Sequence, residues 1–465
     1  MLITYIVVAT FIAMFAYIIL FMVRDAEKTI ANPMNQRQDS YAKYIRRGSV
    51  ITSDGVTVAE TVKDEEGREK RVYPLGSMFA HTVGYSSYSM SGVELSQSFV
   101  MLRSHAGIKK KIKCDLKGEK YPGDNVVLTL DYDLQKAAYD ALGDCRGAVI
   151  VMDPRDGRIL AEVSKPDFDP NSMSDVMDNI MTDEMEEAAP LLNRATQGLY
   201  APGSTFKILT ALEYMREHPD WQSYTYDCEG SDVFGDIGIH CAGDNVHGTV
   251  DISETLTESC NTSTANMGMH IDMNKLHQLA ETFLYNQDLP YDGVYSASKF
   301  NVDGTSNRND IPQTVIGQGT TLVTPLHNAM IMCAVANGGN LMIPYMIDHV
   351  ESVEGVYVKE TKKKTYGTLL EKRECDALLP MLENVAREGT ASGQLGWKPY
   401  YVGGKTGTAE YDNEGNCNSW FIGFAGNSSP EVVISVVVED YSTYGISGTY
   451  VASCVFDTWY EKFGQ

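Results

Sequence analysis

The chain is short of positive charge and of the paired cysteine patterns that hold metals. Lys and Arg number 38 against 62 Asp and Glu among 465 residues, so the formal net charge is −24. Nucleic-acid binding needs a basic surface that neutralises phosphates, so we exclude that class of function. The nine cysteines include no Cys-x-x-Cys pair and no His/Cys group with the linear spacing of a zinc site, so the sequence predicts no metal.

Several other signatures are absent. The sequence has no internal repeat and no low-complexity tract. Gly317-Gln318-Gly319 is not followed by Lys-Ser/Thr, which excludes a phosphate-binding P-loop. The histidines, including His240, His247 and His327, form no catalytic triad or metal pattern. We therefore predict no cofactor.

Two local features leave alternatives open. Cys228 and Cys241 flank a Gly- and Asp-containing stretch that can form a hairpin, and in an oxidising exterior they could pair as a disulfide or stay free. Most other cysteines are expected to be buried small apolar residues. The basic run Lys109–Lys113 could contact anionic polymer or lipid, but we favour the solvated face of a hairpin.

The first 24 residues predict a membrane anchor. No charged residue occurs from Leu2 to Val23, and a bilayer core needs about 20 apolar residues. A cleaved signal peptide would have a shorter apolar run, a basic start and a small-residue cleavage site. Basic residues follow the segment rather than precede it, which by the positive-inside rule places the rest of the chain in the cytoplasm. The chemistry described below favours the opposite orientation.

The remainder is expected to form two domains. Residues 25–130 are polar, with short strand-like pieces, and predict a small β-rich pedestal. Residues 131–465 have strands at both ends and helical stretches between them, which indicates an α+β architecture with an antiparallel sheet. The expected strands and the closing helix cover residues 147–152, 159–163, 404–410, 420–424, 432–438 and 450–463.

A serine and a lysine stand three residues apart near the middle of the chain. Pro202-Gly203 interrupts the sequence, and apolar residues then recur at helical spacing, so we predict a helix that starts near Ser204. Positions i and i+3 share a helix face, which would put the Lys207 amine beside the Ser204 hydroxyl. A serine hydroxyl is a weak nucleophile that needs such a base, so the pair indicates acyl transfer.

Two further motifs follow Ser204 in a fixed order, namely Ser259-Cys260-Asn261 and Lys405-Thr406-Gly407. This ordered trio resembles the penicillin-recognising serine acyltransferases, which are the penicillin-binding proteins and the serine β-lactamases. Two other Ser-x-x-Lys sequences, Ser40–Lys43 and Ser296–Lys299, lack the preceding proline-glycine. Ser296–Lys299 also follows Ser259, which is the wrong order. Ser40–Lys43 lies in polar sequence just past the anchor, and no apolar helical run follows it.

The sequence around the motifs is similar to class B penicillin-binding proteins, most of all from Asp153 to Glu439. Cys260 stands where other versions of the middle motif have Asp. An early segment resembles the penicillin-binding protein A subgroup, namely Asn32–Arg37 with Arg47-Gly48. The class B blocks are Asn193–Lys207, Gly317-Gln318-Gly319 with Thr324-Pro325-Leu326, Gly404–Glu410 and Trp420–Phe424.

The resemblance implies a penicillin-binding transpeptidase fold and a role for each motif residue. Ser204 would attack the penultimate D-alanine of a stem peptide, and Lys207 would accept its proton. An ordinary lysine pKa near 10.4 would have to fall by about three units for this. Ser259 would relay a proton to the leaving amine, and Asn261 would position Lys207 and the substrate backbone.

The third motif would bind substrate. Lys405, with the hydroxyls of Thr406 and Thr408, would hold the terminal carboxylate. Backbone N–H groups of Ser204 and Thr408 would form the oxyanion hole. Gly407 would leave room for the substrate along the strand edge.

The resemblance implies a D,D-transpeptidase that cross-links peptidoglycan and is inhibited by β-lactams. Its catalytic domain would lie outside the cell, and a SEDS-type polymerase would supply the glycan. Alternatives remain a D,D-carboxypeptidase, a scaffold of the division or elongation machinery, and a β-lactamase. Glu281–Asn286 is one residue too long for the Glu-x-x-Leu-Asn element that a class A β-lactamase uses. No signalling domain or glycosyltransferase domain is predicted.

Overall fold

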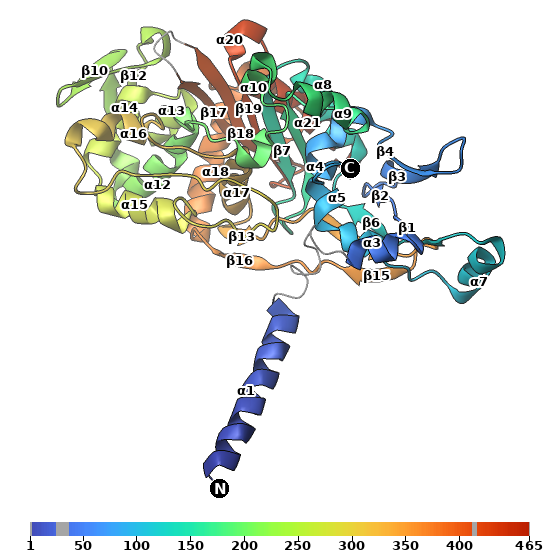
Figure 1. Cartoon of the computed structure of the whole chain (residues 1–465). Helices are drawn as coiled ribbons and strands as arrows, with labels where there is room; N and C mark the ends of the chain where they lie inside the picture. The colour runs from blue at the N-terminus through green and yellow to red at the C-terminus, as the bar shows by residue number, and fades with distance from the viewer. Residues whose placement is uncertain (1, 25–36, 412–415, 465) are drawn as a thin grey trace. The chain divides into compact units, whose positions relative to one another are not determined.

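The computed structural model describes residues 2–24, 37–411 and 416–464 of the chain (Figure 1). They form two compact units, of which the first comprises Met1–Leu128, Asp169–Asp175 and Ile347–Thr361. The second comprises Thr129–Phe168, Val176–Met346 and Lys362–Gln465. The first unit therefore includes two short segments that the sequence analysis had placed in the second domain. Residues 32–36 of the segment that resembles the penicillin-binding protein A subgroup lie outside the described residues.

The N-terminal helix α1 (Leu2–Arg24) is one uninterrupted apolar helix. Its segment Leu2–Met22 has a mean hydropathy of 2.5 and is long enough to cross a membrane. Its side chains from Leu2 to Met22 are exposed, as expected for a helix that faces lipid. The helix fits the predicted single-pass anchor.

The first unit is built on a mixed six-stranded sheet with strand order β15-β14-β6-β2-β3-β4. Its short strands pair antiparallel except for β2 and β6, which run parallel. Strands β14 and β15 come from far along the sequence, which explains why a reading in chain order missed them. The strands of this sheet are β2 (Val50–Ile51), β3 (Thr57–Lys63), β4 (Glu69–Val72), β6 (Asn125–Leu128), β14 (Ile347–Glu351) and β15 (Tyr357–Glu360). A separate two-stranded parallel sheet is formed by β1 (Ile45–Arg46) and β5 (Tyr121–Pro122).

Short helices complete the first unit. The basic run expected on a hairpin lies instead on a helix, α7, so that expectation was wrong. Lysines, which have good helix propensity, at four of the five positions 109–113 and a left-handed Gly118 at the C-cap account for the difference. The helices are α3 (Arg37–Ala42), η1 (Gly76–Phe79), α4 (Ala80–Val83), α5 (Gly92–Ser96), α6 (Ser98–Met101), α7 (Ile108–Lys117) and η2 (Pro170–Ser172), with α9 (Met173–Asn179) at the boundary between units.

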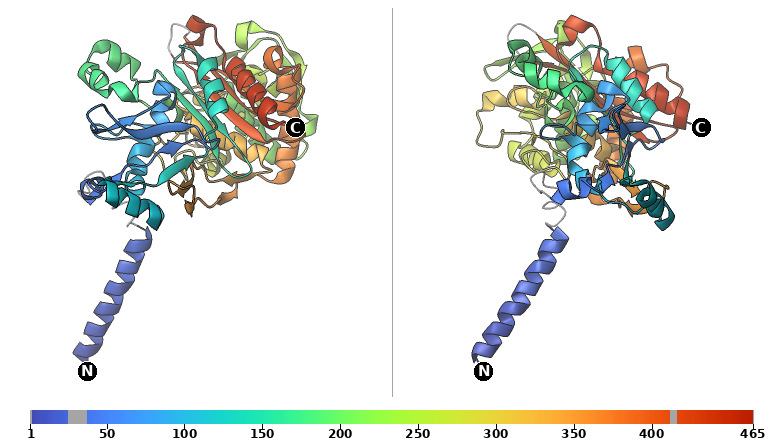
Figure 2. Two further views of the ribbon diagram at one scale, coloured as in Figure 1. Left: turned by 90° about the vertical axis from the view of Figure 1, so that its right-hand side faces the viewer. Right: turned by 45° about the vertical axis from the view of Figure 1, so that its right-hand side comes forward.

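The second unit is built on an antiparallel five-stranded sheet with strand order β17-β18-β19-β7-β8 (Figures 1 and 2). The helices α17 and α21 both pack on β18 and β19. The central strands are buried at almost every position, so both faces of the sheet are covered. The strands are β7 (Gly147–Met152), β8 (Ile159–Lys165), β17 (Tyr401–Glu410), β18 (Cys417–Gly426) and β19 (Val432–Val438).

These strands and the closing helix α21 (Gly448–Phe463) confirm the predicted α+β class. The other helices are α8 (Tyr132–Leu142), α10 (Asp183–Ala188), α11 (Arg194–Gln197), η3 (Gly203–Phe206), α12 (Lys207–Glu217), η4 (Trp221–Ser223), η5 (Ala242–Asp244), α13 (Ile252–Thr257), α14 (Asn261–Met269), α15 (Met273–Thr282), η6 (Arg308–Asp310), α16 (Ile311–Val315), α17 (Pro325–Ala336), α18 (Lys372–Arg387), α19 (Ser392–Leu395) and α20 (Tyr441–Tyr444). Three two-stranded sheets complete the unit, formed by β9 (Tyr226–Cys228) with β12 (Gly248–Val250), β10 (Ser231–Phe234) with β11 (Ile237–His240), and β13 (Asn340–Met342) with β16 (Thr365–Thr368).

Candidate active site

Ser204 lies in a 3-10 turn and not in the first turn of an α-helix as predicted. The turn η3 leads into α12, whose first residue is Lys207. The preceding Gly203 has a φ of +53°, and a Cβ there would lie 2.6 Å from the carbonyl oxygen of Thr408. Glycine is therefore required where the turn meets β17, and Ser204 is held beside that strand.

Two contacts fix the turn from the other side. The backbone N–H of Gly203 donates to the carbonyl oxygen of Gly317 at 2.9 Å. Gly317 has a φ of +85°, and a Cβ there would lie 1.9 Å from the Gly203 carbonyl oxygen. The indole N–H of Trp420 donates to the carbonyl oxygen of Ala201 at 3.0 Å. The block Gly317-Gln318-Gly319 thus supports the Gly203–Phe206 turn, the candidate nucleophile turn, by backbone contact.

A buried ion pair anchors the chain that enters this turn. Glu439 at the end of β19 accepts hydrogen bonds from Arg194 Nε at 2.8 Å and from the Tyr200 hydroxyl at 2.6 Å. Arg146 Nε lies 3.1 Å from the same carboxylate. Arg194 is 2% exposed, so its charge depends on Glu439 for compensation. Sequence reasoning missed this role of Glu439, since no local motif marks it.

Lys207 is fully buried, and its amine meets the second motif. Nζ donates to the Ser259 carbonyl oxygen at 2.6 Å and to Asn261 Oδ1 at 2.6 Å, and lies 3.4 Å from Ser259 Oγ. Within the residues that the structure describes, Ser204 is not among its hydrogen-bond partners. Burial lowers the pKa of Lys207 to about 8, because a charged amine loses hydration there.

The second motif forms the turn between α13 and α14. Ser259 has a φ of +56°, which is unusual for a residue other than glycine. Asn261 is the first residue of α14, and its Nδ2 donates to the carbonyl oxygen of His240 at 2.7 Å. With its Oδ1 on Lys207, the Asn261 amide is held at both ends, which fixes the position of the lysine amine.

The third motif lies on β17, an edge strand of the sheet. Lys405 is fully buried and its Nζ donates to the Thr406 carbonyl oxygen at 3.2 Å. Burial, and then the positive charge of Lys207, holds the pKa of Lys405 well below its ordinary value. Thr406 Oγ1 lies 2.6 Å from Thr390 Oγ1, and Thr408 is exposed.

Gly407 is required for packing inside the protein. A Cβ at this position would lie 3.0 Å from Trp420 Cβ and 3.1 Å from both the Pro202 carbonyl oxygen and Thr205 Cγ2. The absence of a side chain therefore lets the nucleophile turn approach β17. This is a different reason from the substrate clearance expected from the sequence.

The structure thus brings the three motifs to one place in the second unit. A cavity of about 550 Å³ opens beside Asn261. Its lining residues are Gly238, Ile239, His240, Asn261, Gln313, Ile316, Gln318, Gly319, Glu410 and Tyr411. The polar lining and the adjacent edge strand are suited to an extended peptide, which can add to an exposed sheet edge.

The competing sequence motifs have other places. Ser296–Lys299 is not helical, so its serine and lysine do not share a helix face, and Ser40 is exposed on α3. The Glu281 carboxylate is 44% exposed and lies 3.5 Å from His277 Nε2. Asn286 hydrogen-bonds both backbone groups of Phe300 at 2.6 and 3.0 Å. These contacts account for both residues without a water-activating role.

The cysteines differ most from expectation. The predicted hairpin between Cys228 and Cys241 exists as β10 and β11, but the two Sγ atoms lie 3.7 Å apart and both cysteines are free. Cys260 and His247 join them, so that four possible ligand atoms lie within 4.8 Å of one another. The prediction from the sequence rested on linear spacing alone, and this cluster is assembled from residues spread over positions 228–260.

Comparison with known proteins places the chain in a family. Residues 147–457 match the penicillin binding protein transpeptidase domain, and residues 47–126 match the penicillin binding protein A dimerisation domain. The first match alone covers more than half of the chain. The chain belongs to the penicillin-binding protein transpeptidases, as the resemblance of its motifs implied.

Individual relatives agree with this assignment. The chain is 28% identical over 439 residues to the peptidoglycan D,D-transpeptidase PbpA of Mycolicibacterium smegmatis. This alignment covers 88% of this chain and 87% of the relative. The solved D,D-transpeptidase domain of a peptidoglycan glycosyltransferase from Eggerthella lenta is 29% identical, with a TM-score of 0.78 over 90% of this chain and 99% of the other. The ceftriaxone acyl-enzyme complex of penicillin-binding protein A from M. tuberculosis is 24% identical and shares the fold, with a TM-score of 0.80 over 90% and 99%.

Proposed function

We propose that this chain is a peptidoglycan D,D-transpeptidase that works through an acyl-enzyme on Ser204. The observation that carries the proposal is the buried Lys207 amine, which Ser259 and Asn261 hold beside the nucleophile turn. Desolvation lowers its pKa to about 8, so a useful fraction of the amine is neutral near pH 7 and can accept a proton.

Acylation of Ser204 is the first half of the proposed reaction. As the Ser204 oxygen attacks the carbonyl carbon of the penultimate D-alanine, its proton passes to the neutral Lys207 amine. The oxyanion is stabilised by the backbone N–H groups of Ser204 and Thr408, which the contact between Gly203 and Thr408 keeps close together. Collapse breaks the peptide C–N bond. The proton reaches the departing D-alanine nitrogen from Lys207 by way of the Ser259 hydroxyl.

Deacylation completes the transfer. The amine of a second stem peptide attacks the ester carbonyl, gives up a proton along the same path, and releases Ser204. Transfer to water instead of an amine would make the enzyme a carboxypeptidase with the same residues.

Lys405 provides the charge that selects a terminal carboxylate. Its amine is fully buried, and this burial, with the positive charge of Lys207 as a second cause, holds the pKa of Lys405 well below the ordinary value. A substrate carboxylate placed beside Lys405, with the Thr406 and Thr408 hydroxyls, supplies the missing counter-charge. β-Lactams carry an equivalent carboxylate beside their reactive carbonyl and would acylate Ser204 in the same way.

The location of the substrate sets the topology. Peptidoglycan stem peptides lie outside the cell membrane, so the catalytic unit is extracellular and α1 is the single-pass anchor, despite the basic residues that follow it. Residues 25–130 act as the pedestal and residues 131–465 as the transpeptidase domain. Glycan polymerisation comes from a partner, a SEDS-type polymerase.

Labelling with a fluorescent penicillin tests the acyl-enzyme. The full chain should form a stable covalent adduct that Ser204→Ala abolishes, whereas Ser40→Ala, a change at an exposed serine, should leave it intact. An adduct that persists in Ser204→Ala would refute the mechanism. Rapid loss of the adduct from the wild type would favour a β-lactamase.

A second assay separates the remaining functions. Incubation with a stem pentapeptide and an acceptor amine should yield a cross-linked product and free D-alanine. Hydrolysis alone would assign a carboxypeptidase, and no reaction would favour a scaffold. Protease accessibility on intact cells tests the orientation, which a shielded catalytic unit would contradict.

A further inference from the structure

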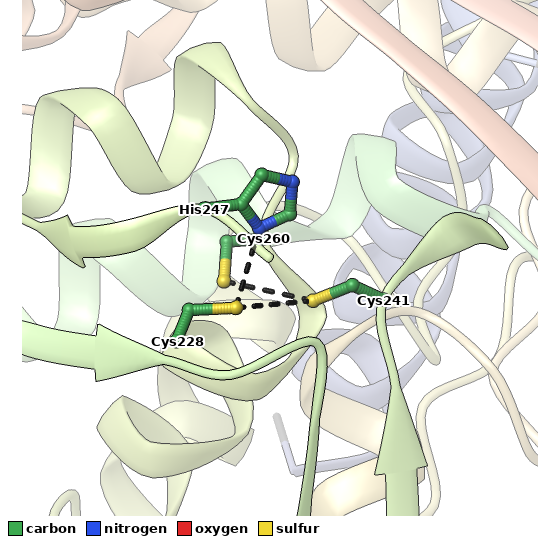
Figure 3. Close-up of side chains that lie close together, drawn as sticks. All are labelled: Cys228, Cys241, His247 and Cys260. Atoms are coloured by element: carbon green, nitrogen blue, oxygen red, sulfur yellow. Dashed lines mark hydrogen bonds between the residues drawn. The ribbon is translucent and has the colours of Figure 1, made fainter. Parts of the chain in front are cut away.

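Three cysteines and one histidine converge at the turn that carries Ser259 and Asn261 (Figure 3). Cys228 ends β9, Cys241 follows β11, His247 precedes β12, and Cys260 caps α14. The Sγ atoms of Cys228 and Cys241 lie 3.7 Å apart, as do those of Cys241 and Cys260, and Cys228 Sγ lies 3.3 Å from His247 Nδ1. All four ligand atoms point into one space.

These separations match the edges of a metal tetrahedron. With Zn–S and Zn–N bonds of about 2.3 and 2.05 Å, tetrahedral geometry puts two sulfurs about 3.8 Å apart and a sulfur and a nitrogen about 3.6 Å apart. A disulfide would need a sulfur separation of about 2.05 Å. It would also leave the third thiol and the imidazole unused, so one disulfide does not account for the arrangement.

The surrounding polypeptide is made of short elements that pack on α14. The segment 226–250 consists of two-stranded sheets, and most residues of β10 and β11 are exposed. Its apolar core is a cluster of Cys228, Cys241, Val250 and Cys260, against which Tyr226 packs. A metal bound at the centre of this small apolar cluster would contribute its binding free energy to the folded state.

Hydrogen bonds around the sulfurs are also those of a thiolate site. The backbone N–H of Gly230 donates to Cys228 Sγ at 3.4 Å, and that of Ser263 donates to Cys260 Sγ at 3.4 Å. The Thr262 hydroxyl donates to Cys228 Sγ at 3.2 Å. Such donors stabilise negative charge on metal-bound sulfur and orient the ligands.

We propose that Cys228, Cys241, His247 and Cys260 bind one structural Zn²⁺ ion. Four protein ligands close the site, as in structural zinc centres, and leave no open position for catalysis. The Cys₃His donor set selects zinc over the oxygen-preferring divalent cations. The ion would replace the weak contacts among the thiols by four bonds.

The site is coupled to the proposed active site through the chain itself. Cys260 stands between Ser259 and Asn261, the two residues that hold Lys207. Cys241 directly follows His240, whose carbonyl oxygen accepts from Asn261. Zinc would therefore fix the backbone of Asn261 and the His240 carbonyl group that its side chain contacts. Zinc binding itself does not depend on the proposed function, whereas this effect on acylation does.

Metal analysis of the purified full chain tests the site directly. Protein prepared with zinc should contain about one Zn²⁺ per chain, and Cys228→Ser and Cys241→Ser should lose it. Cys454→Ser, a change at a free cysteine outside the cluster, is the matched control and should keep the metal. Wild-type protein without zinc, or zinc that survives both serine variants, would overturn the proposal.

Cobalt substitution tests the ligands without relying on a variant that folds. Co²⁺ in a tetrahedral thiolate site gives intense visible bands and a sulfur-to-metal charge-transfer band, which zinc should displace. An octahedral cobalt spectrum would overturn the proposal, as would a Cys228–Cys241 disulfide in protein kept under zinc. The rate of penicillin labelling should fall on chelation and recover with zinc. Loss of zinc with unchanged labelling would leave the metal site but refute its coupling to catalysis.

A separate observation concerns helix α7 in the first unit. Ile108, Ile112 and Leu116 are spaced by four residues and lie on one face, with exposed fractions of 78, 52 and 84%. Cys114, the buried residue of this helix, lies on the opposite face. The apolar stripe therefore points away from the protein body.

The same helix concentrates positive charge in an acidic chain. It carries five lysines and one aspartate, whereas the whole chain has a net charge of −24. An apolar stripe flanked by lysines is typical of helices that lie in a membrane interface with anionic lipids. The 13 steps from Arg24 at the end of α1 to Arg37 span at most about 45 Å, which keeps the first unit near the bilayer.

We infer that α7 binds the surface of an anionic membrane through this stripe. Quenching by brominated lipids tests this with the full chain in vesicles that contain phosphatidylglycerol. Tryptophan fluorescence added by Leu116→Trp should be lost to the quencher, while that added by Val233→Trp, at an exposed site in the second unit, should not. When Lys109→Glu and Lys113→Glu are added to the Leu116→Trp protein, the tryptophan fluorescence should be restored. Equal quenching at both sites, or none at Leu116→Trp, would overturn the inference.

Discussion

Asn261→Asp changes one atom of the proposed active site and adds a charge next to the base. Asn261 Oδ1 lies 2.6 Å from Lys207 Nζ, so an aspartate would put a carboxylate in direct contact with the amine. A carboxylate at this distance favours the charged amine and raises its pKa by about 1–3 units. The variant therefore tests whether neutral Lys207 is the base.

The wild-type profile sets the reference. Burial has lowered the pKa of Lys207 from 10.5 to about 8, which corresponds to about 3.4 kcal/mol against the charged form. About one amine in ten is then neutral at pH 7 and about nine in ten at pH 9. The rate of acylation should rise about tenfold over this range, because only the neutral amine accepts the serine proton.

In Asn261→Asp the rising limb of the plot of acylation rate against pH should move to higher pH by the same 1–3 units. Acylation at pH 7 should therefore fall by about 10- to 1,000-fold and partly recover at high pH. Initial rates of labelling by a fluorescent penicillin measure this. Asn261→Ala, which removes the contact without adding charge, should slow acylation without an upward displacement of the limb. A limb that stays near pH 8 in Asn261→Asp would refute Lys207 as the base.

Two further predictions concern the support of the nucleophile turn. Gly317→Ala should abolish labelling, because its Cβ would overlap the turn, whereas Gly319→Ala shares the positive φ but has its nearest neighbour at 3.7 Å and should retain labelling. Glu439→Gln should cost about 3–5 kcal/mol of unfolding free energy, since it leaves the buried Arg194 charge uncompensated. Arg146→Ala, which removes a 33% exposed partner of the same carboxylate, should cost less than about 1 kcal/mol. Thermal unfolding compares the last two, and equal losses would contradict the buried-pair argument.

Much of the second unit could be predicted from local sequence. Strand β7 is a continuous apolar run and β19 is apolar except for Ser435, and both are buried along their whole length because both faces of the sheet are covered. The order of the three motifs predicted the family, which the domain matches confirm. The individual roles of Ser204, Lys207 and the other motif residues remain predictions.

The features that were missed depend on contacts distant in sequence. Strands β14 and β15 complete a sheet whose other members precede residue 129, and no local pattern announces such an insertion. The four possible zinc ligands spread over residues 228–260 and meet only because β9 pairs with β12 and α14 packs against them. Linear spacing rules assume a compact ligand loop, and this cluster is assembled from separate elements.

The middle residue of the second motif now has a physical role. Ser259 holds a left-handed backbone conformation, which costs about 1–2 kcal/mol for a residue with a Cβ and persists only when its neighbours impose it. Cys260 imposes it from one side, because its Sγ accepts from the backbone of Ser263 and lies 3.7 Å from Cys241 Sγ. An aspartate at this position could cap the helix equally well but could not provide a thiolate. The choice of cysteine is consistent with the cluster, and Cys260 links the strained turn that presents Ser259 and Asn261 to Lys207 with Cys241, a residue outside the three motifs.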